Sequence, residues 1–243
     1  MIKKFVTNTG LIVPAVTKEQ MMGVDKIAVE ETGPNLFQMM ENAGRNLALT
    51  VMDLINEKSL EKKVLLFAGT GGNGGGGICA ARHLLNHGYE LIVILNNEEK
   101  MQEIPAYQLE IFRKAGGQII PFEKVKDVKP DIIIDALIGY SLISAPRGNV
   151  LEMINFINKN NIPTISLDIP TGVLTTSGEN PGEFVKPDIT ITLALPKTGL
   201  HPEKCGKIML ADIGIPKVVY EKIGLKYTSP FSDSYFAAIS LHE

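Results

Sequence analysis

The sequence contains only two cysteines, Cys79 and Cys205, among its 243 residues. Two cysteines cannot build the disulfide framework on which small secreted domains depend, and their spacing matches no zinc motif. The four histidines, at positions 83, 87, 201 and 242, show no metal-ligand spacing either. Cysteine and histidine usage therefore indicates no zinc-type centre and is typical of a protein from a reducing compartment.

Charge and long apolar runs are also scarce. The formal net charge is −3, which excludes the basic surface that nucleic acids and anionic membranes require. No apolar run approaches the roughly 20 residues that span a bilayer, and the N-terminal MIKKFVTNTG lacks the apolar core of a secretory signal. No Ser-His-Asp or Cys-His nucleophile arrangement stands out. We therefore expect a cytoplasmic protein that binds neither nucleic acid nor membrane.

Apolar segments of strand length alternate with segments of helical periodicity. This alternation predicts one α/β domain with a parallel sheet covered by helices on both faces. Strands are expected at residues 64–67, 91–95, 118–121, 132–134, 164–167, 188–193 and 207–210, and helices at about 17–31, 34–56, 78–87, 105–115 and 149–159. The tail, residues 227–243, is unassigned, although residues 232–239 could form a short helix. The domain is expected to span residues 1–243.

Residues 68–77, AGTGGNGGGG, lie between the first of these strands and a helix expected to begin at residue 78. Six of the seven residues from Gly71 to Gly77 are glycine, and Asn73 is the exception. Glycines let the backbone approach a ligand closely, and a helix N-terminus attracts anions. We therefore expect a phosphate-binding loop, the alternative being a tight strand-to-helix turn without a ligand.

The spacing of Gly69, Gly71 and Gly74 also fits the dinucleotide fingerprint G-x-G-x-x-G. That fingerprint requires an acidic residue after the second strand to hold a ribose. The candidates here, Glu98 and Glu99, are displaced. A simple hydride-transfer dehydrogenase is therefore not favoured.

Two aspartates follow the fourth and fifth expected strands. Asp135 begins the turn Asp-Ala-Leu-Ile-Gly, and Asp168 begins the turn Asp-Ile-Pro-Thr-Gly, which contains Thr171. Because the carboxyl ends of parallel strands share one edge of a sheet, Asn73, Asp135, Asp168 and Thr171 are expected to converge. Their oxygen atoms suit a hard cation. The alternative for each aspartate is a helix N-cap or a turn residue.

Several segments together resemble the YjeF N-terminal domain family, the NAD(P)H-hydrate epimerases, which are similar to apolipoprotein A-I-binding protein. The resemblance runs from about residue 16 to residue 216. Its markers, besides the glycine-rich stretch, are MENAGR at 40–45, ARHL at 81–84, DALIG at 135–139, SLDIPTG at 166–172, PKTGL at 196–200 and ADIGIP at 211–216.

The resemblance implies a Rossmann-like three-layer αβα sandwich with a mostly parallel sheet, an N-terminal helical extension and a homodimeric assembly. It implies an isomerase that converts the R epimer to the S epimer at C6 of hydrated NADH or NADPH, a repair of nicotinamide nucleotides. It also implies a potassium ion beside the substrate, with ligands at Asn73, Asp135 and Thr171, where serine is usual.

The resemblance implies substrate contacts on the glycine loop, on the turn that begins at Gly139 and on Asp168. Asp168 is the expected catalytic acid/base, and Lys197 is a further candidate unless it is a solvated loop lysine. The expected substrate-binding residues are Gly72, Asn73, Gly74, Gly75, Gly76, Gly139, Tyr140, Ser141, Leu142, Asp168 and Lys197.

The chain departs from the family pattern within the glycine loop. The usual G-N-N-G-G-D-G has become all glycine except Asn73, so Gly72 replaces an asparagine and Gly76 replaces an aspartate. Tyr140 stands where threonine is usual. Two hypotheses follow: an epimerase, weakened or altered, that uses Asp168, or a catalytically degenerate nucleotide-binding or scaffold module. A separate NAD(P)H-hydrate dehydratase is the expected functional partner, because no such domain fits within the chain.

Overall fold

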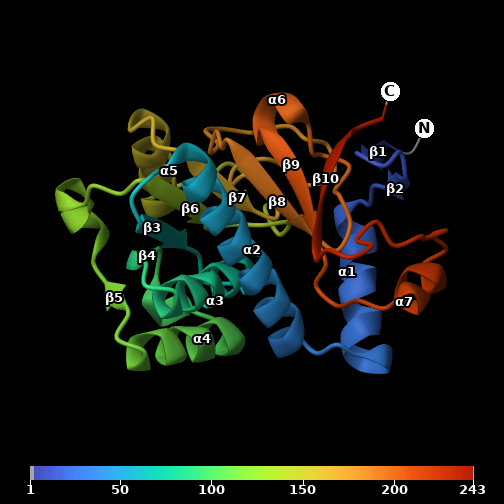
Figure 1. Cartoon of the computed structure of the whole chain (residues 1–243), viewed down its shortest axis with the longest axis horizontal. Coiled ribbons are helices and arrows are strands. Elements are labelled where there is room, and N and C mark those ends of the chain that lie inside the picture. The colour runs from blue at the N-terminus through green and yellow to red at the C-terminus, as the bar shows by residue number, and fades with distance from the viewer. Residues whose placement is uncertain (1–2, 243) are drawn as a thin grey trace.

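The computed structural model (Figure 1) describes residues 3–242, and its ten strands form one sheet in the order β2-β1-β10-β9-β8-β7-β6-β3-β4-β5. The strands are β1 (Lys4–Thr7), β2 (Ile12–Pro14), β3 (Lys63–Ala68), β4 (Glu90–Leu95), β5 (Gln118–Ile119), β6 (Ile132–Ala136), β7 (Thr164–Leu167), β8 (Ile189–Leu193), β9 (Lys207–Ala211) and β10 (Phe236–Leu241). The α-helices are α1 (Lys18–Ile27), α2 (Leu36–Lys58), α3 (Gly72–Asn86), α4 (Glu103–Lys114), α5 (Asn149–Lys159), α6 (Pro202–Cys205) and α7 (Lys217–Lys222).

The part of the sheet ordered β9-β8-β7-β6-β3-β4-β5 is entirely parallel, as the alternation of strands and helices in the sequence predicts. β3 lies between β4 and β6, so the chain crosses over at β3 and leaves a switch point at its carboxyl end. The α/β, Rossmann-like class is therefore confirmed. In open parallel sheets the crevice for a ligand forms at such a switch point.

The two ends of the chain extend the sheet in an antiparallel manner. β10 pairs with both β9 and β1, and β1 pairs with β2. The suggested helix at residues 232–239 is therefore wrong, because residues 236–241 form the strand β10. The reason is tertiary: β10 fills the gap between β9 and the N-terminal hairpin, and Ile239 is buried among residues of both. Within residues 3–242 no helix has the length and apolar character to cross a membrane.

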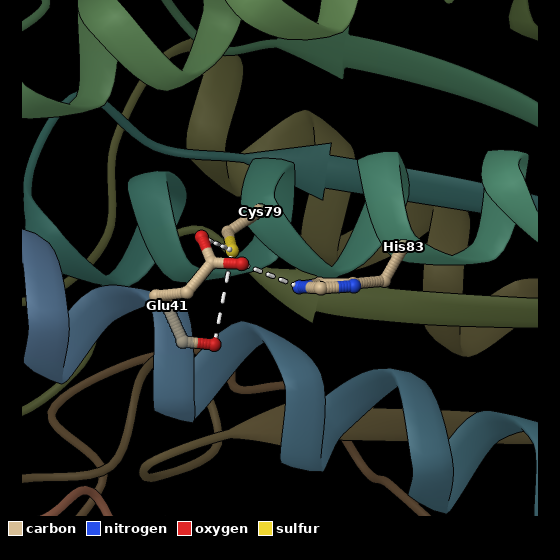
Figure 2. Close-up of side chains that lie close together, drawn as sticks. All are labelled: Glu41, Cys79 and His83. Carbon is tan, nitrogen blue, oxygen red and sulfur yellow. Dashed lines mark hydrogen bonds and ion pairs between the residues drawn. The ribbon is translucent and has the colours of Figure 1, made fainter.

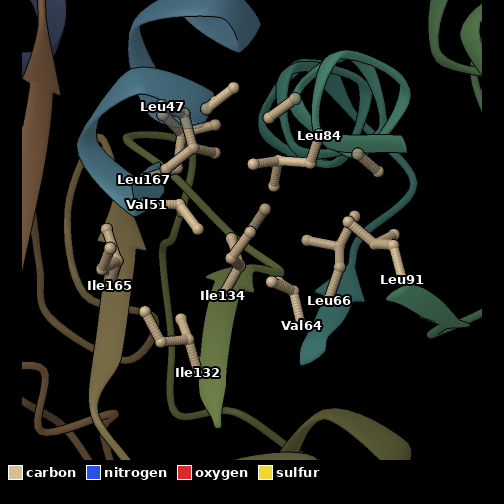
Figure 3. Packing of buried hydrophobic residues seen from close by; sticks show 14 of the residues in the cluster. Leu47, Val51, Val64, Leu66, Leu84, Leu91, Ile132, Ile134, Ile165 and Leu167 are labelled. Atoms are coloured by element: carbon tan, nitrogen blue, oxygen red, sulfur yellow. The ribbon is translucent and has the colours of Figure 1, made fainter. Parts of the chain in front are cut away.

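The sheet is buried on both faces, and alternate residues of β3 point to opposite sides. Val64 and Leu66 belong to the core beneath α2, α3 and α4, whereas Leu65 and Phe67 pack against α5 on the other face. Figure 3 shows the first of these cores, where Leu47 and Val51 of α2 and Leu84 of α3 contact residues from β3, β4, β6 and β7. Because both faces of the sheet are buried, residues that point to either side are apolar, and the strands therefore read as continuous apolar runs in the sequence.

Capping boxes determine where the first two helices begin. Thr17 caps α1 and exchanges hydrogen bonds with Gln20, as the sequence predicts. The second helix was expected to begin near Pro34, but it begins at Leu36, because Asn35 is its N-cap and pairs with Gln38 in a second capping box. These helices place the N-terminal extension over the carboxyl edge of the parallel strands.

Candidate active site

The glycine-rich stretch is a helix rather than a loop. α3 begins at Gly72, with Gly71 as its N-cap, so the expectation that the helix begins at residue 78 is wrong by nearly two turns. Glycine in a helix interior costs about 1 kcal/mol relative to alanine. This unfavourable propensity is the reason why a loop was expected here. Tertiary contacts offset that cost.

These contacts are too close for any side chain. A Cβ at Gly74 would lie 2.0 Å from the carbonyl oxygen of Gly69, and a Cβ at Gly75 would lie 2.6 Å from the sulfur of Met40. A Cβ at Gly77 would lie 2.5 Å from the Cβ of Ala136. The glycines therefore let the first turns of α3 sit directly against α2 and the ends of β3 and β6, where they form one wall of a cavity.

Asp168 follows β7, lines that cavity and accepts hydrogen bonds from three residues. Its carboxylate accepts hydrogen bonds from the backbone amides of Tyr140, at 3.2 Å, and Leu193, at 3.4 Å. Lys197 forms an ion pair with it and also donates to the carbonyl of Leu193 at 2.8 Å. The side chain of Lys197 is only 1% exposed, so Lys197 is a buried partner of Asp168 and not a solvated loop lysine.

The backbone at Asp168 is strained. Its φ is +68°, a left-handed value that non-glycine residues rarely adopt, and the amide of Ile169 bonds back to the carbonyl of Leu167. The same turn occurs at Ala194, after the end of β8. Its φ is +63°, and the amide of Leu195 donates a hydrogen bond to the carbonyl of Leu193. Strain of this kind persists where the surrounding structure holds it and clusters at functional sites. The two turns aim Asp168 and the segment leading to Lys197 at the same space.

Asp135 is fully buried at the end of β6, behind the cavity wall. It accepts four hydrogen bonds: from the hydroxyl and the amide of Thr171 at 2.6 and 2.9 Å, from the hydroxyl of Ser166 at 2.8 Å and from the amide of Leu137 at 3.3 Å. Burial raises the pKa of Asp135, and these hydrogen bonds act in the opposite direction. Within residues 3–242 no cationic side chain forms an ion pair with this carboxylate.

The side chains of Asn73 and Asp168 both lie beside Gly139, in the turn that follows Asp135. A Cβ at Gly139 would lie 3.0 Å from Oδ1 of Asn73 and 3.2 Å from Oδ2 of Asp168, so both polar side chains lie close to the backbone of Gly139. Nδ2 of Asn73 is buried and has no hydrogen-bond partner in the described part of the chain. A buried orphan donor of this kind suits an acceptor on a ligand.

The oxygen set of Asn73, Asp135 and Thr171 fits a monovalent cation. The set consists of one amide, one carboxylate and one hydroxyl, all hard oxygen ligands. The hydroxyl of Thr171 bonds Asp135 and accepts from the amide of Ile138, the residue before Gly139, so the three side chains gather around one turn. A buried carboxylate without a cationic partner is the charge that a bound cation would offset.

The cavity itself has a volume of about 310 Å³. Eight of the expected site residues line it: Gly72, Asn73, Gly76, Gly139, Tyr140, Ser141, Asp168 and Lys197. Five others do not: Gly74 and Gly75 are buried in helix packing, Leu142 is 8% exposed, and Asp135 and Thr171 are fully buried behind the cavity wall. The structure thus brings most of the expected substrate residues to one space between the helical extension and the carboxyl ends of the strands.

Several cavity residues come from α1 and α2 and were not expected from the sequence. Among them Asp25 is the charged one, and its Oδ2 accepts a hydrogen bond of 2.7 Å from the hydroxyl of Tyr140. Burial raises the pKa of Asp25, and the hydrogen bond from Tyr140 and the charge of Lys197 partly oppose this effect. The only sequence signal was its position one helical turn after Met21, on the apolar stripe of α1.

A second cluster of polar groups joins α2 to α3 outside the cavity. Glu41, Cys79 and His83 (Figure 2) place one ligand atom each within 4.8 Å of one another, a grouping that the helical spacing of Cys79 and His83 could have indicated. Arg82 bonds the same carboxylate at 2.6 and 2.8 Å, and burial raises the pKa of Cys79 well above its ordinary value. The carboxylate already has a cationic partner and the thiol stays protonated, so the cluster is a contact between helices.

Comparison with known proteins gives a consistent result. Residues 36–199 match the family model described as YjeF-related protein N-terminus. The chain is 46% identical to a protein named NAD(P)H-hydrate epimerase from Dehalogenimonas lykanthroporepellens, over the whole of both chains. A protein of the same name from Weissella koreensis is 34% identical, with 83% of this chain and 91% of that protein covered.

Longer relatives and a solved structure extend the comparison. A bifunctional NAD(P)H-hydrate repair enzyme from Salinibacter ruber is 30% identical over 89% of this chain, which spans 44% of that enzyme. The crystal structure of the yeast protein ynu0 superimposes with a TM-score of 0.79 and covers 91% of this chain and 98% of its own. Its sequence identity of 24% supports the fold alone.

Proposed function

Because this chain belongs to the YjeF-related N-terminal domain family, we propose that it is an isomerase that converts the R epimer of hydrated NADH or NADPH to the S epimer at C6. The observation that carries the proposal is the buried pair of Asp168 and Lys197 in the cavity at the switch point. The proposal includes a homodimer in the cytoplasm and a separate dehydratase that consumes the S epimer.

The chemistry explains why a buried acid/base pair is needed. C6 of the hydrate carries a hydroxyl group next to a ring nitrogen, so inversion proceeds by loss and re-addition of water or by ring opening. Either route moves a proton to and from oxygen, and a positioned acid/base accelerates such a step by about 10²–10⁴-fold. In the proposed mechanism Lys197 and Asp168 together supply this proton, because their contact lets it pass between the ammonium and the carboxylate.

The loop glycines and Asn73 position the substrate in this proposal. The free Nδ2 donor of Asn73 meets an acceptor on the nucleotide, and the N-terminal amides of α3 favour its negative charge. Asn73, Asp135 and Thr171 would hold a potassium ion, whose positive charge would offset Asp135 and attract oxygen atoms of the substrate. The missing loop aspartate leaves Gly76 as a bare part of the cavity wall.

A coupled assay tests the proposal. The purified protein is given the R epimer in potassium buffer together with a dehydratase specific for the S epimer, and the decay of the R epimer is followed. We expect decay faster than the spontaneous rate, and a loss of about 10²–10⁴-fold in Asp168→Asn. Decay no faster than the blank would contradict the epimerase and favour a binding module.

Removing Asp168 leaves Lys197 buried without its partner, which can destabilise a protein by about 3–5 kcal/mol. The double variant Asp168→Asn with Lys197→Met is therefore the matched control, because it has no unpaired charge. A folded double variant without activity would assign the loss to chemistry. Thermal unfolding of all variants establishes that the compared proteins are folded.

A further inference from the structure

Asp25 and Tyr140 meet at the cavity although 115 residues separate them in the chain. Asp25 lies on α1, and Tyr140 follows β6 in the turn whose backbone amide bonds Asp168. The phenol hydroxyl donates to the Asp25 carboxylate at 2.7 Å, and both residues line the cavity with Asp168 and Lys197. The helical extension therefore brings a second carboxylate to the space where the substrate is proposed to bind.

The surroundings of this pair keep the phenol protonated. Burial raises the pKa of Tyr140, and the negative charges of Asp25 and Asp168 add to the effect. The other titratable groups facing the pair are Lys197 from the segment after β8, Tyr220 of α7 and Lys18, whose Nζ is 3.4 Å from the carbonyl of Ser141. A neutral phenol that donates a hydrogen bond to a carboxylate can relay a proton. The phenol oxygen accepts one proton while the phenol's own proton moves to the carboxylate.

On the route of water loss and re-addition, inversion at C6 requires a proton exchange at two places. The leaving hydroxyl must gain a proton, and the water that adds to the opposite face of the ring must lose one. One acid/base pair adjacent to one face does not serve both positions equally well. The cavity contains two such pairs, Asp168 with Lys197 and Asp25 with Tyr140.

We propose that Tyr140 is a second catalytic residue of the epimerisation and that Asp25 is the positioning residue that receives its proton. This inference rests on the proposed function.

The proton balance of the step is simple. The C6–O bond breaks as the pair of Asp168 and Lys197 gives a proton to the departing hydroxyl, which leaves as water, while the lone pair of the ring nitrogen forms a C6=N bond that the addition of water reverses. A second water forms the new C6–O bond and gives its proton to the oxygen of Tyr140, whose own proton moves to Asp25. One water leaves and one enters, and exchange with solvent returns the proton from Asp25 to the first pair.

The test compares Tyr140→Phe, Asp25→Asn and the control Tyr107→Phe, which changes an exposed tyrosine of α4 outside the cavity. We expect kcat to fall about 10²-fold in Tyr140→Phe with KM unchanged, and the control to match the wild type. In wild-type protein kcat should fall at acidic pH as Asp25 becomes protonated. Asp25→Asn should lower kcat and abolish this acidic limb.

The outcomes separate this inference from the proposed function. A wild-type protein without epimerase activity would contradict both. An active wild type with kcat retained in Tyr140→Phe would contradict only the role of Tyr140. A lower unfolding temperature in Tyr140→Phe with kcat and its pH profile unchanged would show that the contact merely joins α1 to the turn after β6, and it would overturn the inference.

Discussion

Individual glycines determine how closely the parts of the cavity wall approach one another. A Cβ at Gly77 would lie 2.5 Å from Ala136 of β6 and 3.0 Å from Leu66 of β3. Both neighbours are buried core residues that have little room to move. At Gly72, five residues earlier in the same helix, nothing lies within 4 Å of such a Cβ. Replacing glycine by alanine therefore tests packing and helix propensity together at Gly77, but helix propensity alone at Gly72.

Gly77→Ala is expected to destabilise the protein. Overpacking costs about 1–3 kcal/mol, and the better helix propensity of alanine recovers only about 1 kcal/mol. Gly72→Ala should be neutral or stabilising by about 0.4–1 kcal/mol. Urea unfolding of both variants measures the difference. Equal stabilities would show that the wall of the cavity relaxes to admit a methyl group.

At the scale of elements, the contact between α2 and α3 holds the glycine-rich turn against the sheet. Glu41 of α2 bonds Arg82 and His83 of α3, the latter at 2.8 Å. Burial alone would raise the pKa of Glu41, but the hydrogen bonds and charges of its partners outweigh it and lower the pKa. A carboxylate with a lowered pKa stabilises the folded state above its unfolded pKa and loses that effect as the pH falls.

Glu41→Gln is expected to destabilise the fold by about 1 kcal/mol at neutral pH, a modest value because the side chain is 43% exposed. The difference should shrink below about pH 4.5, as the wild-type carboxyl group becomes protonated in both states. Glu57→Gln, on the exposed C-terminal part of the same helix, is the control and should change stability by less than about 0.5 kcal/mol. A difference that grows on acidification would contradict this linkage.

At the scale of the whole molecule, the sheet brings segments from across the chain to the turn that joins Asp135 to Gly139. Asp135 comes from β6, Thr171 from the turn after β7 and Asn73 from the start of α3. A cation bound there would link all three elements. Because a ligand that binds only the folded state raises the stability of the whole domain, the proposed ion has a readout that is independent of activity.

The unfolding temperature should be higher in potassium chloride than in tetramethylammonium chloride of equal ionic strength. Binding at a hundred times Kd would add about 2.7 kcal/mol. Thr171→Val should abolish this difference, whereas Thr50→Val, which removes a buried hydroxyl of α2, should retain it. Equal unfolding temperatures of the wild type in both salts would contradict the potassium site.

The sequence by itself determined the features that rest on local chemistry. Apolar runs of strand length predicted the parallel strands, the box of Thr17 and Gln20 predicted the start of α1, and the residues after two strands predicted that Asp135 and Asp168 would meet at one edge. Each of these signals lies within a few neighbouring residues, where periodicity and capping act.

Only the tertiary structure decided the rest, because contacts between distant residues outweigh local preference. The helix over Gly72–Gly77 is disfavoured by local propensity, but Gly74, Gly75 and Gly77 let its first turns pack closely against α2 and the sheet, and these contacts offset the cost. β10 becomes a strand because β9 and β1 leave a place for it. Lys197 is buried because Asp168, 29 residues earlier, provides its counter-charge, and Asp25 faces the cavity because Tyr140 meets it there.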